Sequence, residues 1–538
     1  MGADDKKMMT DPFVEGFGKV YKGIVAVGVL CVLVVFPLYF RYYYFDILEA
    51  KYQFYYMVMI GMFAVCLLTA IAFLAVDFLE YKLAHTRAFG QAFSFKKLRA
   101  AMSPADWCLL LFLAVGVIST MQSRYVFEAF WGNEGRFTGL FLHLIYGVGF
   151  FLVSRLYRPK DWHMELFLLA AMAAMLFGIT DYFQMDLLDF KKDISDYDRD
   201  TFMSTFGNIN TYVTYVGIIF GCLSTLFVRE KKVWKAALYY VSYLVAVTAM
   251  IMTNSDNAVL AMGMVFAFLP LAVFWKRQGI ERYFLELAGF CACAWAVGQI
   301  STAMEGRVIP IYGFFGVVIH LKALLPAATA CLCLGAGIHY MGKKEVGCPD
   351  GGLGKRYVLA WGIFLILCTA ALLFVLYDAN WGGNAARYGA LSSYLHFSDE
   401  WGTYRGMIWR ITLEAYGKQP LSHKLWGYGL DTFGLLVYPY QGETGRIMGQ
   451  VFDSAHNEYL QYLVTIGPIG FLAYLGFLAS AIGSLLKNAF DQDWCLAIVF
   501  GVGCYLAQAI LTINLPIVTP IMWMLLAVGV ARAKKGAD

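Results

Sequence analysis

The sequence predicts an all-α polytopic membrane protein with about fourteen transmembrane helices and one long external loop that carries short helices. Hydrophobic residues make up 60% of the 538 residues, and charged residues make up only 15%. Soluble domains are about half apolar and about a quarter charged. The apolar excess extends along nearly the whole chain, with a mean hydropathy of +0.60. It therefore indicates many membrane spans.

Apolar runs must contain about 20 residues to cross a bilayer. Aromatic residues such as Tyr42 and Tyr55 stand at several ends of the runs, as expected at the level of the lipid headgroups. The predicted spans are 23–42, 55–78, 106–121, 138–156, 164–183, 210–228, 236–252, 257–275, 285–304, 316–341, 357–377, 458–486, 494–512 and 515–531. They divide the chain into a membrane domain (1–377, about eleven spans), an external catalytic loop (378–457) and C-terminal membrane helices (458–538, about three spans).

The loops between these spans alternate between a basic set and a set that is poor in Lys and Arg. The basic loops are 82–99, 155–160, 229–235, 276–282, 343–356 and the tail from 532. Because Lys and Arg accumulate on the cytoplasmic side of membrane proteins, we expect these loops inside the cell. An even number of spans then places both termini in the cytoplasm.

Charge and cysteine usage exclude several other classes of protein. The formal net charge of +4 is small and scattered, which excludes a nucleic-acid-binding protein. The 12 cysteines lie almost entirely inside apolar runs, so they do not form a disulfide framework. The Cys-x-Cys pairs at Cys291 and Cys331 lack the further ligands of a metal site. The N-terminus has no cleavable signal pattern. We expect neither a metal nor a cofactor.

The segment 378–457 stands apart because it is a polar connection rich in Trp, Tyr and Gly. Connections longer than about 15 residues are usually functional or disordered, and the aromatic content argues against disorder. The stretch Tyr404–Tyr416 has helical apolar spacing. We therefore predict one or two short helices that pack over the membrane domain.

His456 is the first candidate for chemistry, because it precedes an apolar run that begins with polar residues. Asp453 or Ser454 is expected to cap the helix, which places His456 in the first turn. There the positive end of the helix dipole disfavours imidazolium, so the ring stays neutral and can act as a general base. The alternative is an inert histidine at the membrane interface.

Two arginines of the external loop are candidates for binding an anion. On a helix, Arg405 and Arg410 point about 140° apart, so only one of them faces a given site. The guanidinium fork matches two phosphate oxygens at once. The alternative is contact with lipid headgroups or pairing with nearby carboxylates such as Asp399. This alternative is favoured for Arg410 and stays open for Arg405.

Glycines and a proline mark two bends near these residues. Gly427 and Gly429 predict a tight turn, and Gly467–Pro468 predicts a bend in the helix that follows His456. Further polar residues at predicted external ends are Asn208, Asn210, Asn257 and Arg136, for which helix capping is an alternative to ligand binding. His320 and Lys322 lie within the tenth run and are minor candidates.

Together these motifs resemble the O-antigen ligase and polymerase superfamily. The run from His456 to Leu460, followed by Gly467 and Gly470, is similar to the family signature H-N-x-x-L…G-x-x-G. Two family-like elements precede it in the order that the family has: Arg-x-x-x-Trp (Arg405 to Trp409) and G-x-G-x-x-x-F (Gly427 to Phe433). Earlier in the chain, Gly207 to Asn210 is similar to the family's G-N-P-N element, with Ile in place of Pro. The match is specific over about 400–475; the first 380 residues agree only in hydropathy and short elements.

The resemblance implies a GT-C-like, metal-independent membrane glycosyltransferase in the bacterial plasma membrane. Family members transfer a glycan from undecaprenyl pyrophosphate to an acceptor at the outer face. The implied partners are a lipid-linked glycan donor and a sugar, protein or wall-polymer acceptor. Ligation and polymerisation both fit the sequence.

The resemblance also implies roles for particular residues. His456 takes the role of the base and Arg405 that of a pyrophosphate ligand, with Asn457, Glu458 and Asn210 in support.

The second phosphate-binding arginine of the family departs from its usual place. The family often has a Ser-Arg pair between the seventh and eighth spans, where this chain has Ser255 and Asp256. Arg136 and Arg410 are our candidates for this role, with Arg307 as a further alternative.

A lipid-linked oligosaccharide flippase is the rival class, since it also has about fourteen spans. A flippase is expected to show two related halves and polar groups at the membrane midplane. Such halves are not visible in the sequence, and the polar residues cluster near the C-terminal end. A ligase-like binding scaffold is a third possibility.

Overall fold

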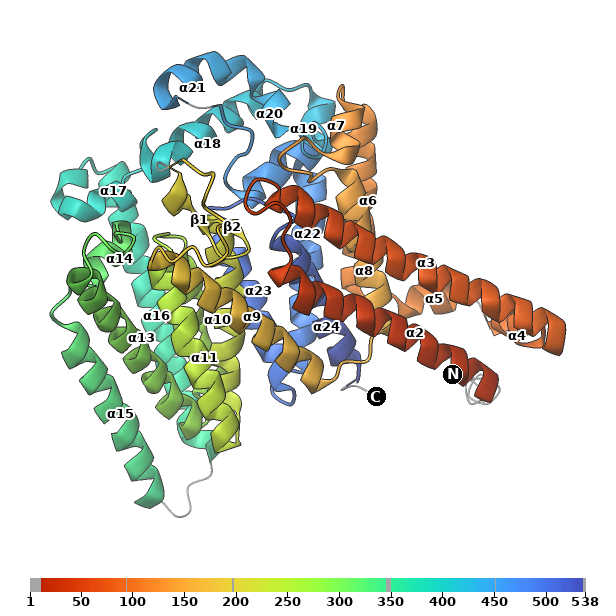
Figure 1. Ribbon diagram of the computed structural model, residues 1–538, viewed down its shortest axis with the longest axis horizontal. Helices are drawn as coiled ribbons and strands as arrows, with labels where there is room; N and C mark the ends of the chain where they lie inside the picture. Colours follow the sequence, from red (N-terminus) through yellow and green to blue (C-terminus); the bar gives the residue numbers. More distant parts are fainter. Residues whose placement is uncertain (1–10, 93, 196–197, 345–349, 450, 536–538) are drawn as a thin grey trace.

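The computed structural model describes residues 11–92, 94–195, 198–344, 350–449 and 451–535, and a helix occupies each of the fourteen predicted runs (Figure 1). These helices are α2 (Pro12–Leu30, continued through η1, Cys31–Val35, and η2, Phe36–Leu38), α3 (Ile47–Tyr81), α6 (Pro104–Gln122), α8 (Leu140–Leu156), α9 (Asp161–Tyr182), α10 (Ile209–Arg229), α11 (Val233–Met252), α12 (Ala258–Val273), α13 (Arg277–Ala303), α15 (Leu324–Lys344), α16 (Asp350–Asn380), α22 (Glu458–Lys487), α23 (Asp493–Gln508) and α24 (Thr519–Lys535).

Shorter helices connect them. Between α3 and α15 these are α4 (Ala84–Ala92), α5 (Phe95–Ala101), α7 (Val126–Trp131), η3 (Arg199–Thr201) and α14 (Gly313–Val318). The external segment carries η4 (Ala385–Leu391), α17 (Ser392–Leu395), α18 (Trp401–Gly417), α19 (Leu421–Trp426), α20 (Phe433–Leu436), η5 (Tyr438–Tyr440) and α21 (Gln441–Met448). One or two short helices were predicted there. That number was too low, because the breaks at glycines and prolines divide the segment into short pieces.

In the described part of the chain, nine helices are long and apolar enough to cross a membrane. Four shorter apolar helices, α8, α12, α15 and α23, add to them. The protein is therefore a helical, polytopic membrane protein. The predicted count of about fourteen spans and the division into three domains stay predictions.

Helix α10 forms the centre of the bundle. Its most apolar stretch is entirely buried, and it packs against α11, α12, α13 and α23. A Cβ on Gly221 of α10 would lie 2.6 Å from the carbonyl oxygen of Phe500 in α23. The glycine thus allows the two backbones to approach closely, as small residues do between membrane helices.

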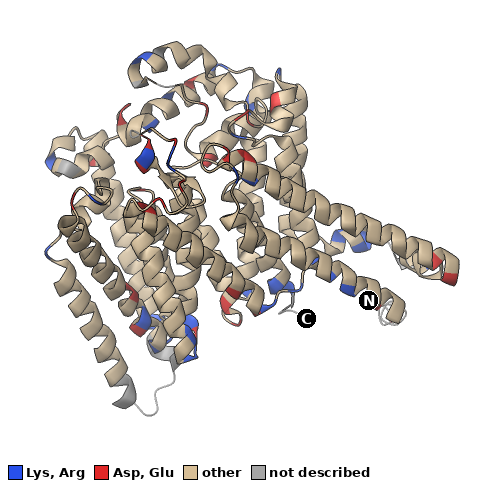
Figure 2. Cartoon of the chain, viewed as in Figure 1, with Lys and Arg blue, Asp and Glu red and all other residues tan. Residues whose placement is uncertain are grey.

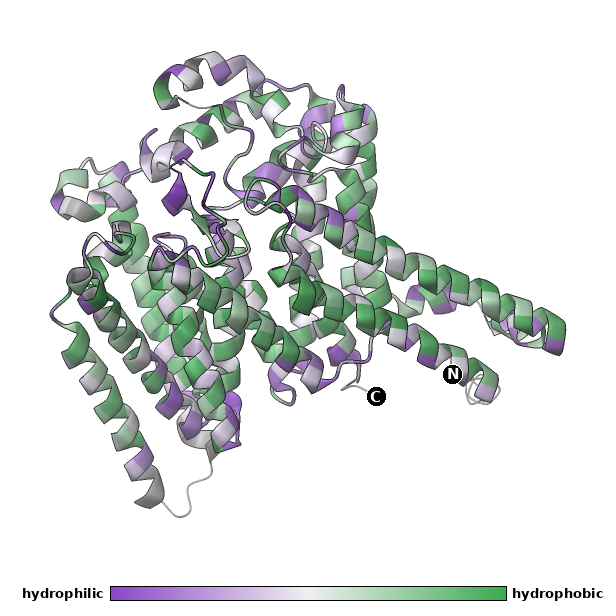
Figure 3. Ribbon diagram, viewed as in Figure 1, coloured by the Kyte–Doolittle hydropathy of each residue, from purple (hydrophilic) through white to green (hydrophobic). Residues whose placement is uncertain are grey.

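The outer helices have the opposite character, since the most apolar 18 residues of α16 include no buried residue and those of α3 are 17% buried. Figure 3 shows mostly apolar residues along the visible length of α3. A helix that is apolar all round and uncovered by protein fits a lipid environment.

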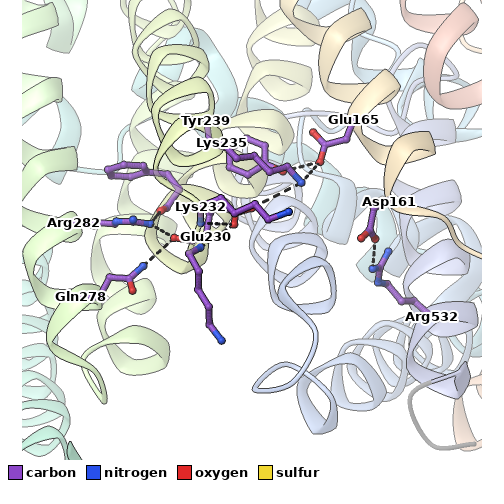
Figure 4. A network of polar contacts seen from close by, with 11 residues as sticks. Asp161, Glu165, Glu230, Lys232, Lys235, Tyr239, Gln278, Arg282 and Arg532 are labelled. Atoms are coloured by element: carbon purple, nitrogen blue, oxygen red, sulfur yellow. Dashed lines mark hydrogen bonds and ion pairs between the residues drawn. The ribbon is translucent and has the colours of Figure 1, made fainter.

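Charged residues gather at the end of the bundle opposite α18 to α21 (Figure 2). Figure 4 shows part of this end, where Lys235 Nζ lies 2.6 Å from Glu165 Oε1, and Tyr239 donates to the same oxygen at 2.8 Å. Arg532 of α24 pairs with Asp161 at the start of α9. The loops 155–160, 229–235, 276–282 and the C-terminal tail thus meet at one end, as the alternation predicted.

Two local features differ from the sequence-based expectations. A two-residue antiparallel hairpin, β1 (Phe202–Met203) with β2 (Gly207–Asn208), pairs Phe202 with Asn208 and precedes α10. The tenth run is broken between α14 and α15, so His320 and Lys322 lie in an exposed turn and not within one continuous helix.

The bend predicted at Gly467–Pro468 is confirmed, because Gly467 in α22 has φ 68° and ψ 173°. Pro468 has no N–H, so the carbonyl of Val464 has no helical partner. The predicted glycine turn supplies one: the N–H of Tyr428 donates to Val464 O at 3.3 Å, and that of Gly429 donates to Thr465 O at 3.0 Å. The external segment is thereby hydrogen-bonded to the break in α22.

Gly427 should be essential to this packing. Its φ is 89°, and a Cβ there would collide with the carbonyl oxygen of Thr465. We expect Gly427→Ala to lower the free energy of unfolding by about 3 kcal/mol, from backbone strain plus overpacking. Thermal unfolding of the purified protein in detergent measures the effect. Gly442→Ala in α21 is the matched control, because nothing lies within 4 Å of its added Cβ. Equal melting temperatures for the two variants would contradict the prediction.

Candidate functional site

A cavity of about 240 Å³ lies between the membrane helices and the external segment. It brings together four of the predicted site residues: His456, Arg405, Arg136 and Asn210. They come from the segment before α22, from α18, from the loop between α7 and α8, and from the start of α10. The remaining lining residues are Asn208, Thr211, Thr214, Tyr505, Leu511, Thr512, Ile513, Leu515, Val518 and Thr519.

His456 does not lie in the first turn of α22, as predicted, but just before the helix. Asn457 is the N-cap, and its Oδ1 accepts from the N–H of Leu460 at 3.0 Å. The expectation that Asp453 or Ser454 caps the helix was wrong, because Asn457 is closer to the free N–H groups. His456 has φ 46°, a left-handed conformation that is uncommon for a residue with a side chain.

Neighbouring hydrogen bonds fix this conformation of His456. The Ala455 carbonyl accepts from Trp409 Nε1 at 2.9 Å, and the Ala455 N–H donates to Gln461 Oε1 at 2.9 Å. On the other side, the Glu458 N–H donates to the Ala509 carbonyl at 2.9 Å. The backbone is thus held from both directions, and the imidazole lines the cavity.

The environment of His456 keeps its ring neutral. Burial, followed by the positive charges of Arg405 and Arg136, lowers its pKa to about 4, while Asp453 opposes this shift. The downward direction was predicted, although the expected cause was the helix dipole. A neutral imidazole has a free nitrogen lone pair, so His456 can accept a proton near neutral pH.

Arg405 opens the regular part of α18 and faces the cavity. The three residues before it, Gly402 to Tyr404, all have left-handed φ values of 61° to 67°. Its Nη1 donates to the Gly402 carbonyl at 2.9 Å, whereas its buried Nε has no hydrogen-bond partner among the described residues. Burial lowers the pKa of the Arg405 guanidinium. An anion in the cavity would supply the missing acceptor.

Arg136 lies on the other side of the cavity and has a carboxylate partner. Its Nε and Nη2 donate to the two oxygens of Asp453 at 2.9 and 2.5 Å. The loop that carries it is anchored by Asp431, whose carboxylate accepts from the N–H groups of Asn133 at 2.8 Å and Thr138 at 3.0 Å. Asp431 therefore sets the position of Arg136.

Arg410 is not part of this cavity. It is exposed on the opposite side of α18, where its Nε and Nη2 donate to the carboxylate of Asp399 at 2.9 and 2.6 Å. This is the ion-pair alternative considered from the sequence, and it follows from the helical angle between Arg405 and Arg410. Arg307 is also exposed and lines none of the described cavities near His456. Of the three candidates for a second arginine, only Arg136 reaches the cavity.

The predicted supporting residues have separate structural roles. Asn457 caps α22, and Asn210 Oδ1 accepts from Ser255 Oγ at 2.7 Å. Glu458 is buried beneath the cavity, where its oxygens accept from Tyr474 and Tyr505 at 2.7 and 2.8 Å. Asn208 is the side-chain cap of α10, as expected.

Several lining residues were missed from the sequence. Thr211 and Thr214 follow Asn208 and Asn210 on the same helix, and their helical spacing could have identified them. Tyr505, Thr512 and Thr519 lie in or between apolar runs, where no sequence signal separates them from residues of the core. Among the residues that the structure describes, no group of three or more His, Cys, Asp or Glu residues could hold a metal ion.

Comparison with known proteins gives one match. The model of the O-antigen ligase family matches residues 327–475. This range contains Arg405 and His456, but not Arg136 or Asn210. A search of the curated proteins finds no match. The predicted resemblance is therefore confirmed for this region.

The pKa of His456 gives a direct prediction. Because the pKa is about 4, the ring should stay unprotonated between about pH 5 and 7, where free histidine with a pKa of about 6.5 titrates. Diethyl pyrocarbonate modifies only neutral imidazole, so its rate of reaction at His456, followed by mass spectrometry, should stay constant down to about pH 5. N-acetylhistidine in the same solution is the control. Parallel titration of the two would contradict the neutral assignment.

Proposed function

We propose that this multi-pass membrane protein, which carries an O-antigen ligase family domain over residues 327–475, is a metal-independent inverting glycosyltransferase. It moves a glycan from an undecaprenyl-pyrophosphate-linked donor to a hydroxyl group of a sugar, protein or wall-polymer acceptor. The observation that carries the proposal is the single cavity in which His456, Arg405 and Arg136 converge from separate parts of the chain.

The two arginines suit a pyrophosphate between them. Among the lining residues, Arg405 and Arg136 are the cationic groups, and Arg405 has a buried Nε that needs an acceptor. Arg136 already holds an oxyanion, the carboxylate of Asp453, which a phosphate group would replace. One guanidinium group can donate two parallel hydrogen bonds to two phosphate oxygens, and its positive charge offsets the negative charge that develops on the leaving group. The donor pyrophosphate is therefore assigned to Arg405 and Arg136.

His456 is assigned the role of general base. It accepts the proton of the acceptor hydroxyl as that oxygen attacks the anomeric carbon of the donor. The new C–O bond forms on the face opposite the pyrophosphate, the old C–O bond breaks, and its electron pair stays on the departing phosphate oxygen. The configuration at the anomeric carbon is thereby inverted. The low pKa of His456 keeps the base in its neutral form at the start.

The position of the cavity favours chemistry at the outer face. The basic loops gather at the far end of the bundle, which the distribution of Lys and Arg assigns to the cytoplasm. The cavity then lies near the outer surface of the bacterial plasma membrane, beneath the external segment 378–457, and both termini are cytoplasmic. The family motifs imply a GT-C-like fold for this glycosyltransferase.

Loss of the base should stop turnover without unfolding the protein. We expect His456→Ala to lower kcat by a factor of about 10² to 10⁴, because the imidazole that accepts the proton is removed. The measurement is the consumption of lipid-linked glycan by purified protein in liposomes. Wild-type turnover should persist with a chelator present. Unchanged product formation by the variant would refute the role of His456, and transport of the lipid without turnover would favour a flippase.

The two arginines of α18 should differ sharply in effect. Arg405→Gln and Arg136→Gln should each lower kcat/KM by a factor of about 100 or more, since each removes a charge from the phosphate site. Arg410→Gln is the matched control on the same helix. Its pair with Asp399 is exposed and lies outside the cavity, so activity should stay within about twofold of wild type. Comparable losses for Arg405→Gln and Arg410→Gln would contradict the assignment.

A further inference from the structure

A second cavity, of about 320 Å³, adjoins the first and has no role in the mechanism above. The two cavities share Arg405, Asn210 and Leu511, which form the wall between them. The second cavity is otherwise lined by the start of α10, by the connection between α11 and α12, by the start of α14 with the residue before it, and by the irregular first turn of α18. These residues are Ile209, Asn254, Ser255, Asp256, Asn257, Tyr312, Gly313 and Thr403.

The lining has the chemistry of a site for hydroxyl groups. Amides, hydroxyls and a carboxylate predominate, which does not suit a lipid chain. Asp256 and Arg405 are the charged lining residues, and their opposite signs do not favour a second phosphate. Neutral ligands with many donors and acceptors, such as saccharides, match a mixture of this kind.

A buried polar atom in the lining of the second cavity, in addition to Arg405 Nε, has no hydrogen-bond partner among the described residues. Asn257 is only 5% exposed, and its Oδ1 accepts no hydrogen bond from the described residues. Its Nδ2 makes only a long contact of 3.4 Å with Thr214 Oγ1. A buried carbonyl oxygen without a donor is costly, so a ligand hydroxyl that donates to it would be stabilised.

Hydrogen bonds hold two other lining residues, Asp256 and Asn254, in place. The carboxylate of Asp256 accepts from the Phe314 N–H at 2.8 Å and from the Tyr394 hydroxyl at 2.9 Å. Asn254 has φ 54°, and its Oδ1 accepts from the Tyr312 N–H at 2.7 Å. Left-handed residues that are held by surrounding contacts cluster at functional sites. A preformed wall also lowers the entropy that binding removes.

We propose that this second cavity is a saccharide subsite, which holds a sugar unit next to the pyrophosphate bound by Arg405. The proposal rests on the proposed function, because Arg405 separates the two cavities and the sugar must be linked to the reacting groups. The Asn257 Oδ1 accepts from a sugar hydroxyl, and Tyr312 offers an aromatic face at the rim. The sugar can belong to the donor or to the acceptor.

Binding measurements with two lipids test the subsite. The first is the lipid-linked glycan that accumulates in cells lacking this protein, and the second is undecaprenyl pyrophosphate without a sugar. In the full-length protein, Asn257→Leu should weaken binding of the glycosylated lipid by a factor of about 10. The affinity of the variant for undecaprenyl pyrophosphate should stay within about twofold of the wild-type value. This result identifies a subsite for the donor saccharide.

A second variant guards against misfolding of the buried Asn257→Leu protein. Tyr312 is 67% exposed, so Tyr312→Ala keeps the core and should show the same selective loss. Tyr438→Ala is the matched control, because Tyr438 is 69% exposed on the external segment and lines neither cavity. This control should bind both lipids like the wild type.

The remaining outcomes are equally decisive. Unchanged lipid binding with a KM for the acceptor raised about tenfold would assign the subsite to the acceptor saccharide. Equal weakening of both lipids by Tyr312→Ala, or no change in any of these quantities, would overturn the proposal. Arg405→Gln separates the pyrophosphate assignment from the saccharide subsite, because it should weaken the binding of both lipids. If it weakens the binding of neither lipid while Tyr312→Ala selectively weakens binding of the glycosylated lipid, the pyrophosphate assignment fails and the saccharide subsite stands.

Discussion

The arrangement of the site depends on the contact between the glycine turn of the external segment and the break in α22. Pro468 leaves the Val464 carbonyl without a helical donor, and the N–H groups of Tyr428 and Gly429 bind to the exposed carbonyls. Two residues later, the buried carboxylate of Asp431 binds the loop that carries Arg136. One short turn thus ties three separate parts of the chain to each other.

The same contact explains how Arg405 and His456 come to face each other. Apolar side chains of α18 and α20 pack with residues on either side of His456 in one small core: Met407, Ile408, Ile411, Phe433, Val437, Phe452, Ala455 and Val464. Trp409 adds a hydrogen bond to Ala455. Because Arg405 lies one helical turn before Trp409, the core that fixes Trp409 also directs Arg405 toward the cavity.

The electrostatics of the cavity are consistent with this geometry. Burial of His456 disfavours its charged form, and the two guanidinium groups add to this effect, so the ring remains neutral and can accept a proton. Asp453 moderates the effect, since it pairs with Arg136 while it lies three residues from His456. A bound oxyanion would take over part of that pairing. The charges that act on His456 therefore come from three separate segments: α18, the loop before α8 and the segment before α22.

Much of the fold followed from the sequence, because apolar runs and basic loops are local patterns set by the bilayer. A helix occupies each of the fourteen runs, although a turn breaks the tenth. The helix over Tyr404–Tyr416 and the bend at Gly467 are present, and His456 and Arg405 could be selected from their motifs. Local sequence did not separate Arg136 from Arg410, or identify Tyr505 and the second cavity. Those depend on which distant segments meet. Packing of the external segment against α22 decided that Arg136 enters the site, and helical angle with an ion pair to Asp399 decided that Arg410 does not.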